Sequence, residues 1–446
     1  MNYLRLHFHR LTSVNLFRFG AFASVNMLAL SSVSAQDHDD LFTIELPVSD
    51  AAPLLDTYLK SALNNNAGLR AAFDEWQVAL EDIPQVTALP NPTLQWTHFV
   101  EEIQTRTGPQ NNRFVLSQAI PWRGKRSLAG KMAADRAEGL WWAAAGLKLD
   151  VIRDVKQVYY EYAYLAQAIR IVKENISLLY NLEPVVQARV RGGASQGDLL
   201  RLQVEIGKLE NESETLEQLR PALNEQLNAI MNDPTSESKP WPTIAPPEGR
   251  VFRRADLKVI LDRMNPELRQ MDWRRKQADH LISRRKLENR PDFTVGLTYI
   301  ETGSATTAIK PSDSGDDPFG ITVGVSIPIW RKKIDAGVRQ SRSHESAMHR
   351  SITQKRYTLH AQLELQIYRL DDAARQIALY QDSLIPRAQQ AMEITQVEYE
   401  SDNAALLDVI DSERELLSFE KSYWRAVSDY GKRLAELEAL CGGDLS

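Results

Sequence analysis

The chain has 446 residues, a formal net charge of −6 and a single cysteine, Cys441. An acidic chain is poorly suited to binding nucleic acid, and a lone cysteine excludes a disulfide framework within the chain. The length could hold two or three ordinary domains, so the order of patterns along the chain has to decide the architecture.

Residues 1–35 have the features of a cleaved signal peptide. Three arginines precede an apolar stretch from Phe19 to Leu30, and small residues follow it up to Ala35. The apolar stretch is well short of the roughly 20 residues that a membrane-spanning helix needs. Cleavage would remove three arginines and no acid, which takes the formal charge from −6 to −9. No cysteine follows the expected cleavage point, so we expect no lipid attachment there.

The rest of the sequence contains one pattern twice. Residues 114–130 read FVLSQAIPWRGKRSLAG, and residues 321–337 read ITVGVSIPIWRKKIDAG. Each segment has an alternating strand that ends in Ile-Pro, then a tryptophan, a basic cluster and a helical pattern. Because each copy of an internal repeat forms one structural unit, we assign a first repeat to residues 36–231 and a second to residues 251–441.

Long helices account for most of each repeat. Apolar residues from Val151 to Leu179 alternate at spacings of four and three, which is the seam of a coiled coil. At 1.5 Å per residue, a helix built on this seam extends on the order of 100 Å. The patterns predict long helices at residues 127–191, 198–231, 336–402 and 406–441, and a shorter helix opening each repeat at about 52–86 and 255–287.

Proline and glycine mark the breaks between these helices. Five prolines between residues 232 and 250 predict a linker between the repeats. Pro221 and Pro386 lie inside predicted helices, and we expect each to disturb its helix. Gly442 and Gly443 end the last helix, which leaves residues 442–446 as a short tail.

Two β-hairpins, at residues 93–120 and 292–329, precede the long helices. In the second hairpin Phe293, Val295, Leu297 and Tyr299 face one way, and Thr294, Gly296 and Thr298 face the other. Strands of about 9–11 residues can cross a bilayer within a tilted barrel. We expect polar loops between the strands, at residues 101–112 and 302–318.

Four strands cannot close a barrel, because about eight are needed to leave room for side chains. An open sheet edge is forbidden in lipid, since its unpaired backbone groups have no water to bind. If the hairpins span a membrane, several chains must share one barrel: two chains give eight strands, and three give twelve and a lumen. The alternative is a soluble coiled-coil protein with two ordinary hairpins.

Three segments of the sequence resemble the TolC-like outer-membrane efflux protein family. Residues 265–268, Asn-Pro-Glu-Leu, form a helix start similar to that of the family. The run Ile-Pro-Trp-Arg-Gly-Lys-Arg at residues 120–126 looks most like the heavy-metal (CzcC/CusC-like) branch. Residues 192–198, Gly-Gly-Ala-Ser-Gln-Gly-Asp, resemble the helical tip at which these proteins meet their adaptor. At the second tip Asp402 stands where the family usually has glycine.

The resemblance implies a fold that is mainly α with a small β part. Long coiled-coil helices would form a periplasmic tunnel, and four transmembrane strands per chain would contribute to a trimeric, twelve-stranded β-barrel. It also implies the location: the outer membrane of a Gram-negative bacterium, with the helices extending into the periplasm.

The resemblance further implies three sets of functional residues. The tip residues, where an adaptor would dock, are Gly192, Gly193, Ser195, Asp198, Asp402 and Asn403. The acidic candidates for a gate or lumen ring are Asp198, Asp408 and Asp411, with Arg189 and Arg201 as candidate partners. The residues of the membrane-interface junction are Pro121, Trp122, Arg123, Lys125, Pro328, Trp330 and Arg331. Asp198 and Asp408 could equally be ordinary acids at helix N-termini, stabilised by the helix dipole.

Histidines give no pattern for a metal site or for catalysis. His344, His349 and His360 share one predicted helix, but spacings of three or four would be needed to place them on one face. His98, in the first strand, is interpreted as lumen-facing. We therefore expect no enzymatic activity, no cofactor and no metal site.

The resemblance therefore implies the outer-membrane exit duct of a tripartite efflux system, which would passively conduct heavy-metal cations out of the cell. Its partners would be two further copies in a homotrimer, a periplasmic adaptor (membrane fusion) protein, an inner-membrane proton-driven RND-type pump and outer-membrane lipid, with no nucleic acid. Two alternatives remain open: a duct for drugs, dyes or secreted polypeptides, and a periplasmic coiled-coil scaffold without a pore.

Overall fold

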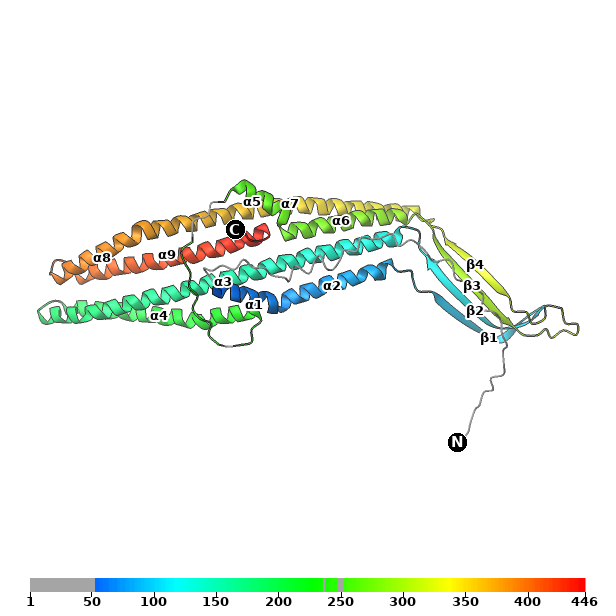
Figure 1. Cartoon of the computed structure of the whole chain (residues 1–446), viewed down its shortest axis with the longest axis horizontal. Coiled ribbons are helices and arrows are strands. Elements are labelled where there is room, and N and C mark those ends of the chain that lie inside the picture. Colours follow the sequence, from blue (N-terminus) through cyan, green and yellow to red (C-terminus); the bar gives the residue numbers. More distant parts are fainter. Residues whose placement is uncertain (1–52, 236, 248–251, 446) are drawn as a thin grey trace, which may run out of the picture. The chain divides into compact units, whose positions relative to one another are not determined.

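The computed structural model describes residues 53–235, 237–247 and 252–445 (Figure 1). The predicted signal peptide lies outside these residues. The helices are α1 (Pro53–Asn65), α2 (Ala67–Thr87), α3 (Lys125–Arg191), α4 (Gln196–Met231), α5 (Arg254–Met264), α6 (Pro266–Leu287), α7 (Arg331–Leu379), α8 (Ile385–Glu400) and α9 (Leu406–Cys441). The strands are β1 (Thr93–Thr105), β2 (Gly108–Ile120), β3 (Asp292–Thr302) and β4 (Phe319–Ser326). The fold is thus mainly α with a small β part, as predicted.

The order of elements recurs in the two halves of the chain. Each half has two short helices, two antiparallel strands and long helices that turn back on themselves. The four strands form one antiparallel sheet in the order β1-β2-β3-β4, so β2 of the first half pairs with β3 of the second. No helix among the described residues combines the length and the apolar character that a membrane span requires.

The opening helix of each half is broken into two, where the sequence predicted one. The breaks fall at Asn66 and Asn265, and each side-chain oxygen accepts a hydrogen bond from the backbone N–H three residues later. Each side-chain amide also donates to a carbonyl at the end of a long helix, Ile230 of α4 or Leu440 of α9, at 2.9 Å. One asparagine in each half therefore caps a helix and ties it to a long helix.

The predicted helix at residues 336–402 is also interrupted. A π-helical turn, η3 (Tyr380–Leu384), separates α7 from α8 directly before Pro386. Proline has no N–H to donate within a helix, and its ring clashes with the preceding turn, so a wider turn at this point relieves the clash. Pro221, in contrast, lies within α4, which continues as one helix from Gln196 to Met231.

The first hairpin spans residues 93–120 as predicted, but its strands are longer and its loop is shorter than expected. β1 and β2 each have 13 residues, and only Arg106 and Thr107 separate them, where we expected a polar loop from residue 101 to 112. The register shifts between His98 and Ile103, which marks a bulge in the ladder. The polar residues beyond Glu101 thus continue the two strands instead of leaving the sheet.

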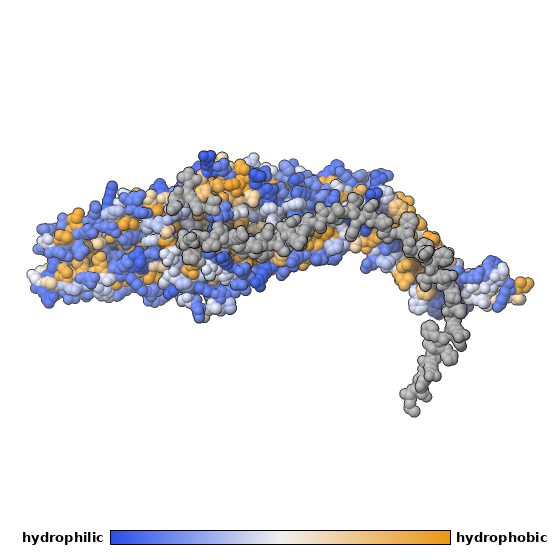
Figure 2. Space-filling view, viewed as in Figure 1, coloured by the Kyte–Doolittle hydropathy of each residue, from blue (hydrophilic) through white to orange (hydrophobic). Residues whose placement is uncertain are grey.

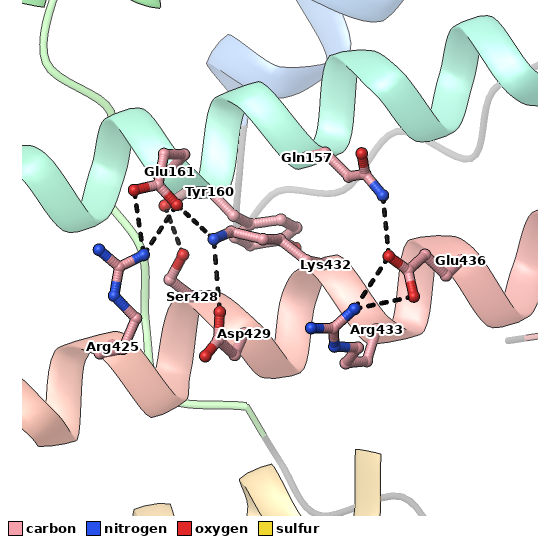
Figure 3. Close-up of polar contacts among 9 residues, drawn as sticks. All are labelled: Gln157, Tyr160, Glu161, Arg425, Ser428, Asp429, Lys432, Arg433 and Glu436. Atoms are coloured by element: carbon pink, nitrogen blue, oxygen red, sulfur yellow. Dashed lines mark hydrogen bonds and ion pairs between the residues drawn. The ribbon is translucent and has the colours of Figure 1, made fainter. Parts of the chain in front are cut away.

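Helices α3 and α9 join the two halves through a close polar contact (Figure 3). Glu161 of α3 accepts hydrogen bonds from Arg425, at 2.8 Å, and from Lys432 of α9. Burial alone would raise the pKa of Glu161, but these two cations hold it below its usual value. The ring of Tyr160 lies directly against the α9 backbone here, since a Cβ atom at Gly431 would lie 2.5 Å from that ring.

Candidate functional site

One face of the four-stranded sheet is apolar across all four strands. In the register of the sheet, Leu94, Leu116, Leu297 and Ile321 lie directly beside one another, and so do Trp96, Phe114, Tyr299 and Phe319. All eight side chains are exposed, and Ile321 retains 71 % of its accessible surface. Figure 2 shows hydrophobic residues gathered over the strands. Continuous apolar patches of this kind mark contact with a membrane or with another protein.

The opposite face of the sheet carries small and polar residues. One row across the strands consists of Thr93, Ser117, Gly296 and Thr322, and a second of Ala119, Thr294 and Gly324. This alternation between adjacent residues is the pattern of a barrel wall with lipid on one side and water on the other.

The sheet has two open edges. Within the described residues β1 pairs only with β2, and β4 pairs only with β3. An exposed apolar edge strand presents unpaired N–H and C=O groups that bind any strand placed beside it. The sheet is therefore incomplete as a membrane structure until further strands are added.

His98 does not lie on the face that the sequence suggested. By alternation it shares the side of Leu94 and Trp96, and not the side of the small and polar residues, which does not favour a lumen-facing side chain. Its Nδ1 lies 3.0 Å from Asn112 Oδ1, which also accepts a hydrogen bond from the Trp96 indole. The spacing of two residues from Leu94 to Trp96 to His98 already indicated this face, but the polarity of histidine suggested the opposite one.

The two strand-to-helix junctions differ in their contacts. At the first, Pro121 directly follows β2, and Trp122 stacks on Phe293 with ring centroids 6.0 Å apart. The backbone N–H of Trp122 and the ammonium group of Lys125 both donate to Asp292, at 2.7 and 2.8 Å. Arg123 precedes α3.

At the second junction, Pro328 lies two residues beyond β4, and Trp330 leaves 73 % of its surface exposed. Arg331 opens α7, and its side chain forms no hydrogen bond or ion pair with the described residues. The second junction therefore offers its tryptophan and its cation to the surroundings, whereas the first holds Trp122 and Lys125 internally and leaves Arg123 exposed.

The first helical tip is the turn between α3 and α4. Gly193 has a φ of 113°, in the region that favours glycine, and Ser195 caps α4 by accepting a hydrogen bond from the Gly197 N–H. Gly192, Gly193 and Ser195 are exposed. Asp198 is half-buried, with its carboxylate 3.7 Å from Arg201.

The second tip is the turn between α8 and α9. Asp402 has a φ of 68°, a conformation that aspartate and asparagine adopt more easily than other non-glycine residues. This explains how Asp402 can stand where the family usually has glycine. Asn403 is exposed beside it, Asp408 accepts a hydrogen bond from the Ala405 N–H, and Asp411 forms an ion pair with Arg414.

Arg189 links the two tips. Its guanidinium forms an ion pair with Asp402, donates to the Tyr399 carbonyl at 2.6 Å and lies 4.3 Å from the centroid of the Tyr399 ring. The sequence suggested Arg189 as a partner for Asp198, Asp408 or Asp411, and the structure gives it a different acid. Tyr399 was missed, although it lies only three residues before the unusual Asp402.

Below the tips, ion pairs connect α4 with α9. Glu205 pairs with Arg414 and Glu212 with Lys421, so both partners advance by seven residues, as in a coiled coil. This heptad spacing of opposite charges was visible in the sequence and could have indicated the contact. The hydrogen bond from Arg414 lowers the pKa of Glu205.

Glu413 lies beside these ion pairs between α4 and α9, and only 3 % of its surface is exposed. Its Oε1 has no hydrogen-bond partner among the described residues. Burial raises its pKa to about 8, the charge of Glu205 adds to this, and Arg414 opposes it. A carboxyl group that is protonated near neutral pH therefore lies inside the helical bundle. An acid between the apolar pairs Val409–Ile410 and Leu416–Leu417 was a sequence signal for it.

Among the residues that the structure describes, no group of three or more His, Cys, Asp and Glu side chains could hold a metal ion. His360 contacts Asp262, and its Nε2 lies 3.1 Å from the Asp262 carboxylate. The three acids at the tips, Asp198, Asp408 and Asp411, each contact a different group and do not form one cluster. What the described surfaces offer is thus a wall-like sheet and charged helical tips.

Residues 261–443 match the family model described as outer membrane efflux protein. This part of the chain is thus similar to the outer membrane efflux protein family. The resemblance to the TolC-like outer-membrane efflux family is thereby confirmed. No curated protein matches the chain in sequence.

Solved structures with the same fold extend the likeness to nearly the whole chain. The outer-membrane channel OprN matches with a TM-score of 0.73 at 14 % identity, covering 91 % of this chain and 92 % of its own. The outer membrane protein VceC from Vibrio cholerae matches with a TM-score of 0.73 at 15 % identity, covering 89 % and 97 %. CusC, whose structures concern folding and transmembrane channel formation, matches with a TM-score of 0.73 at 15 % identity, covering 87 % and 92 %.

The buried carboxyl of Glu413 predicts that the free energy of unfolding of this protein depends on pH. The pKa of Glu413 rises from 4.5 to about 8 on folding. Its contribution to the free energy of unfolding is therefore fully present below pH 4.5 and is lost as the pH rises through 8. Ionisation of Glu413 at pH 7 lowers the free energy of unfolding by on the order of 3 kcal/mol, and Glu413→Gln removes this destabilisation. We expect the variant and the wild type to unfold at similar temperatures at pH 5, and the variant to unfold at a higher temperature at pH 8.

Circular dichroism of the detergent-purified protein against temperature measures this difference. Glu415→Gln, two residues along on the exposed side of α9, is the matched control and should follow the wild type at both pH values. Parallel unfolding temperatures of Glu413→Gln and wild type from pH 5 to 8 would contradict the assignment.

Proposed function

We propose that this chain is the outer-membrane channel of a tripartite efflux system and that it passively conducts substrate from a pump and adaptor to the cell exterior. The observation that carries this proposal is the apolar face shared by all four strands of a sheet with two open edges. In lipid each unpaired backbone group at such an edge costs several kcal/mol. Two further copies of the chain would supply eight more strands and close a twelve-stranded barrel with a lumen.

In this homotrimer the long helices form a tunnel that extends into the periplasm. Its far end consists of the two helical tips, whose exposed residues Gly192, Gly193, Ser195, Asp402 and Asn403 are available to an adaptor protein. An inner-membrane proton-driven RND-type pump would load the substrate, so the channel itself performs no chemistry. The strand-to-helix junctions lie at the membrane interface, where exposed Trp330 and Arg331 would meet lipid headgroups.

The tip is the candidate gate. In a trimer, each of the residues Asp198, Asp408 and Asp411 would occur three times around the axis. Asp408 already caps α9, and Asp411 is paired with Arg414, so Asp198, whose nearest cation is 3.7 Å away, keeps the most freedom to face the lumen. The contact of Arg189 with Asp402 and Tyr399 holds the two tips of one chain together in the closed form.

Heavy-metal cations are the substrate that we propose. The support is the resemblance of residues 120–126 to the heavy-metal branch. The matched channels have nearly equal identities of 14–15 %, so the comparisons do not choose between this substrate and drugs, dyes or secreted polypeptides.

Growth of a deletion strain tests the substrate. We expect hypersensitivity to salts of copper, silver, zinc, cobalt or cadmium and normal growth on dyes and antibiotics, with recovery when the gene is restored. Sensitivity to dyes and antibiotics alone would exclude the metal assignment and leave the channel assignment intact.

Adjacent residues of β4 test the membrane sheet. Ile321→Arg places a charge on the apolar face, where an arginine at the membrane midplane costs about 2–4 kcal/mol in each chain. We expect this variant to fail to insert into lipid vesicles. Thr322→Arg changes the opposite face, so it should insert normally and alter single-channel conductance.

Flotation with vesicles and planar-bilayer recordings measure these two effects. Equal insertion of Ile321→Arg and Thr322→Arg would remove the observation on which the channel proposal depends. A wild-type protein that stays in the soluble fraction of the cell would favour the periplasmic coiled-coil scaffold.

The contact of Arg189 predicts a more open channel when it is removed. Arg189→Ala deletes an ion pair, a charged hydrogen bond and an aromatic contact at the tip. A loss of about 1.4 kcal/mol from the closed form raises the open population about tenfold. We expect a higher mean conductance in planar bilayers.

Arg191→Ala is the matched control, because Arg191 is exposed and contacts only the Gln187 carbonyl of its own helix. Its conductance should equal that of the wild type. An unchanged conductance for Arg189→Ala would show that this link does not hold the gate.

A further inference from the structure

A cavity of about 300 Å³ lies between the end of α6 and the first turns of α7, directly after the second strand-to-helix junction. We refer to it as the junction cavity. Three cations line it: Lys286 in the last turn of α6, and Arg331 and Arg342 of α7. The polar residues Asn289 and Asp335 complete its wall together with two apolar side chains.

The three cations of the junction cavity have no partner within the described chain. None of them forms an ion pair or a side-chain hydrogen bond there. This contrasts with their neighbours: Arg285 is paired with Glu288, and at the first junction Lys125 is held by Asp292. Arg126, also at the first junction, donates to the Thr87 carbonyl. The first junction thus holds Lys125 and Arg126 internally and leaves Arg123 exposed, whereas the second gathers three cations without a described partner around one cavity.

The charge of the junction cavity selects an anion. Three cations face a single carboxylate, Asp335, in a chain whose net charge is −6. Two of the three are arginines, whose planar guanidinium groups bind phosphate oxygens in pairs. A phosphate group is therefore the anion that fits this lining best.

The apolar part of the lining selects a phosphate that carries a hydrocarbon chain. Ile334 and Val338 lie one turn apart on α7, between the two arginines. The exposed residues Ile327, Ile329 and Trp330 lie in the chain between β4 and this helix. Asn289 and Asp335 can hydrogen-bond hydroxyl groups, which the headgroup of a glycerol-bearing phospholipid supplies.

We propose that the junction cavity binds the headgroup of an anionic phospholipid of the phosphatidylglycerol class. Arg331, Arg342 and Lys286 hold its phosphate, and Ile334 and Val338 contact the start of its acyl chains. This inference rests on the proposed function, because a lipid can reach this level only if the sheet lies in the membrane. The bound lipid would fix the depth of each chain at the second junction.

Two double variants of equal charge test the junction cavity. Arg331→Gln with Arg342→Gln removes two cations from the lining, and Lys332→Gln with Lys333→Gln removes two unpaired cations from the same turns outside it. Binding of dioleoyl phosphatidylglycerol to the detergent-purified full chain is measured by native mass spectrometry. We expect the first variant to weaken binding about tenfold. The second should change it less than about twofold.

Other outcomes would overturn the proposal. Equal weakening by both double variants would indicate diffuse surface charge, and tighter binding of dioleoyl phosphatidylethanolamine would exclude an anionic headgroup. Displacement of the lipid by millimolar inorganic phosphate would assign the cavity to free phosphate. Dissociation of the oligomer by Arg331→Gln with Arg342→Gln would assign it to a second copy of the chain.

Vesicle flotation separates this inference from the proposed function. If the wild type fails to float with vesicles, the channel proposal fails and the lipid site fails with it. If both double variants float like the wild type and phosphatidylglycerol binding is unchanged, only the lipid site is wrong.

Discussion

The pairing of backbone groups at the sheet edges is the constraint on which the rest of the structure depends. The apolar face of the sheet suits lipid, yet β1 and β4 each leave one side unpaired in the described chain. Lipid offers no hydrogen bonds, so the edges of one chain have to meet the edges of others. In the proposed trimer, a closed ring of chains would place the polar face of every sheet toward a common lumen and bring the helices that follow the strands around the same axis.

The helical part transmits that arrangement away from the membrane. α3 contacts α2, α4, α6 and α9, so one long helix touches both halves of the chain. Ion pairs between α9 and its neighbouring helices set the register of these helices. Examples are Glu161 with Lys432 and Glu205 with Arg414. Exposed ion pairs contribute little to the free energy of unfolding, but an ion pair between two long helices specifies how the helices are aligned along their length.

Much of this architecture was readable in the sequence because it depends on periodicity. The alternation at Phe293–Tyr299 gave the apolar face, and the heptad seam from Val151 gave α3 nearly to its observed ends. The helix breaks at Asn66 and Asn265 were missed because a single capping side chain leaves the surrounding helical pattern unchanged. The link from Arg189 to Asp402 was missed because their contact spans 213 positions, and no local pattern reports such a distance.

Asp292 belongs to the second half of the chain, but both groups that it binds, the Trp122 N–H and the Lys125 ammonium, belong to the first. The pairing of β2 with β3 crosses the same boundary. The halves are thus joined covalently through the proline-rich segment after α4 and non-covalently both at the base of the sheet and along the long helices. A chain cut within that segment keeps the second connection, so its two fragments carry the means to reassemble in the correct register.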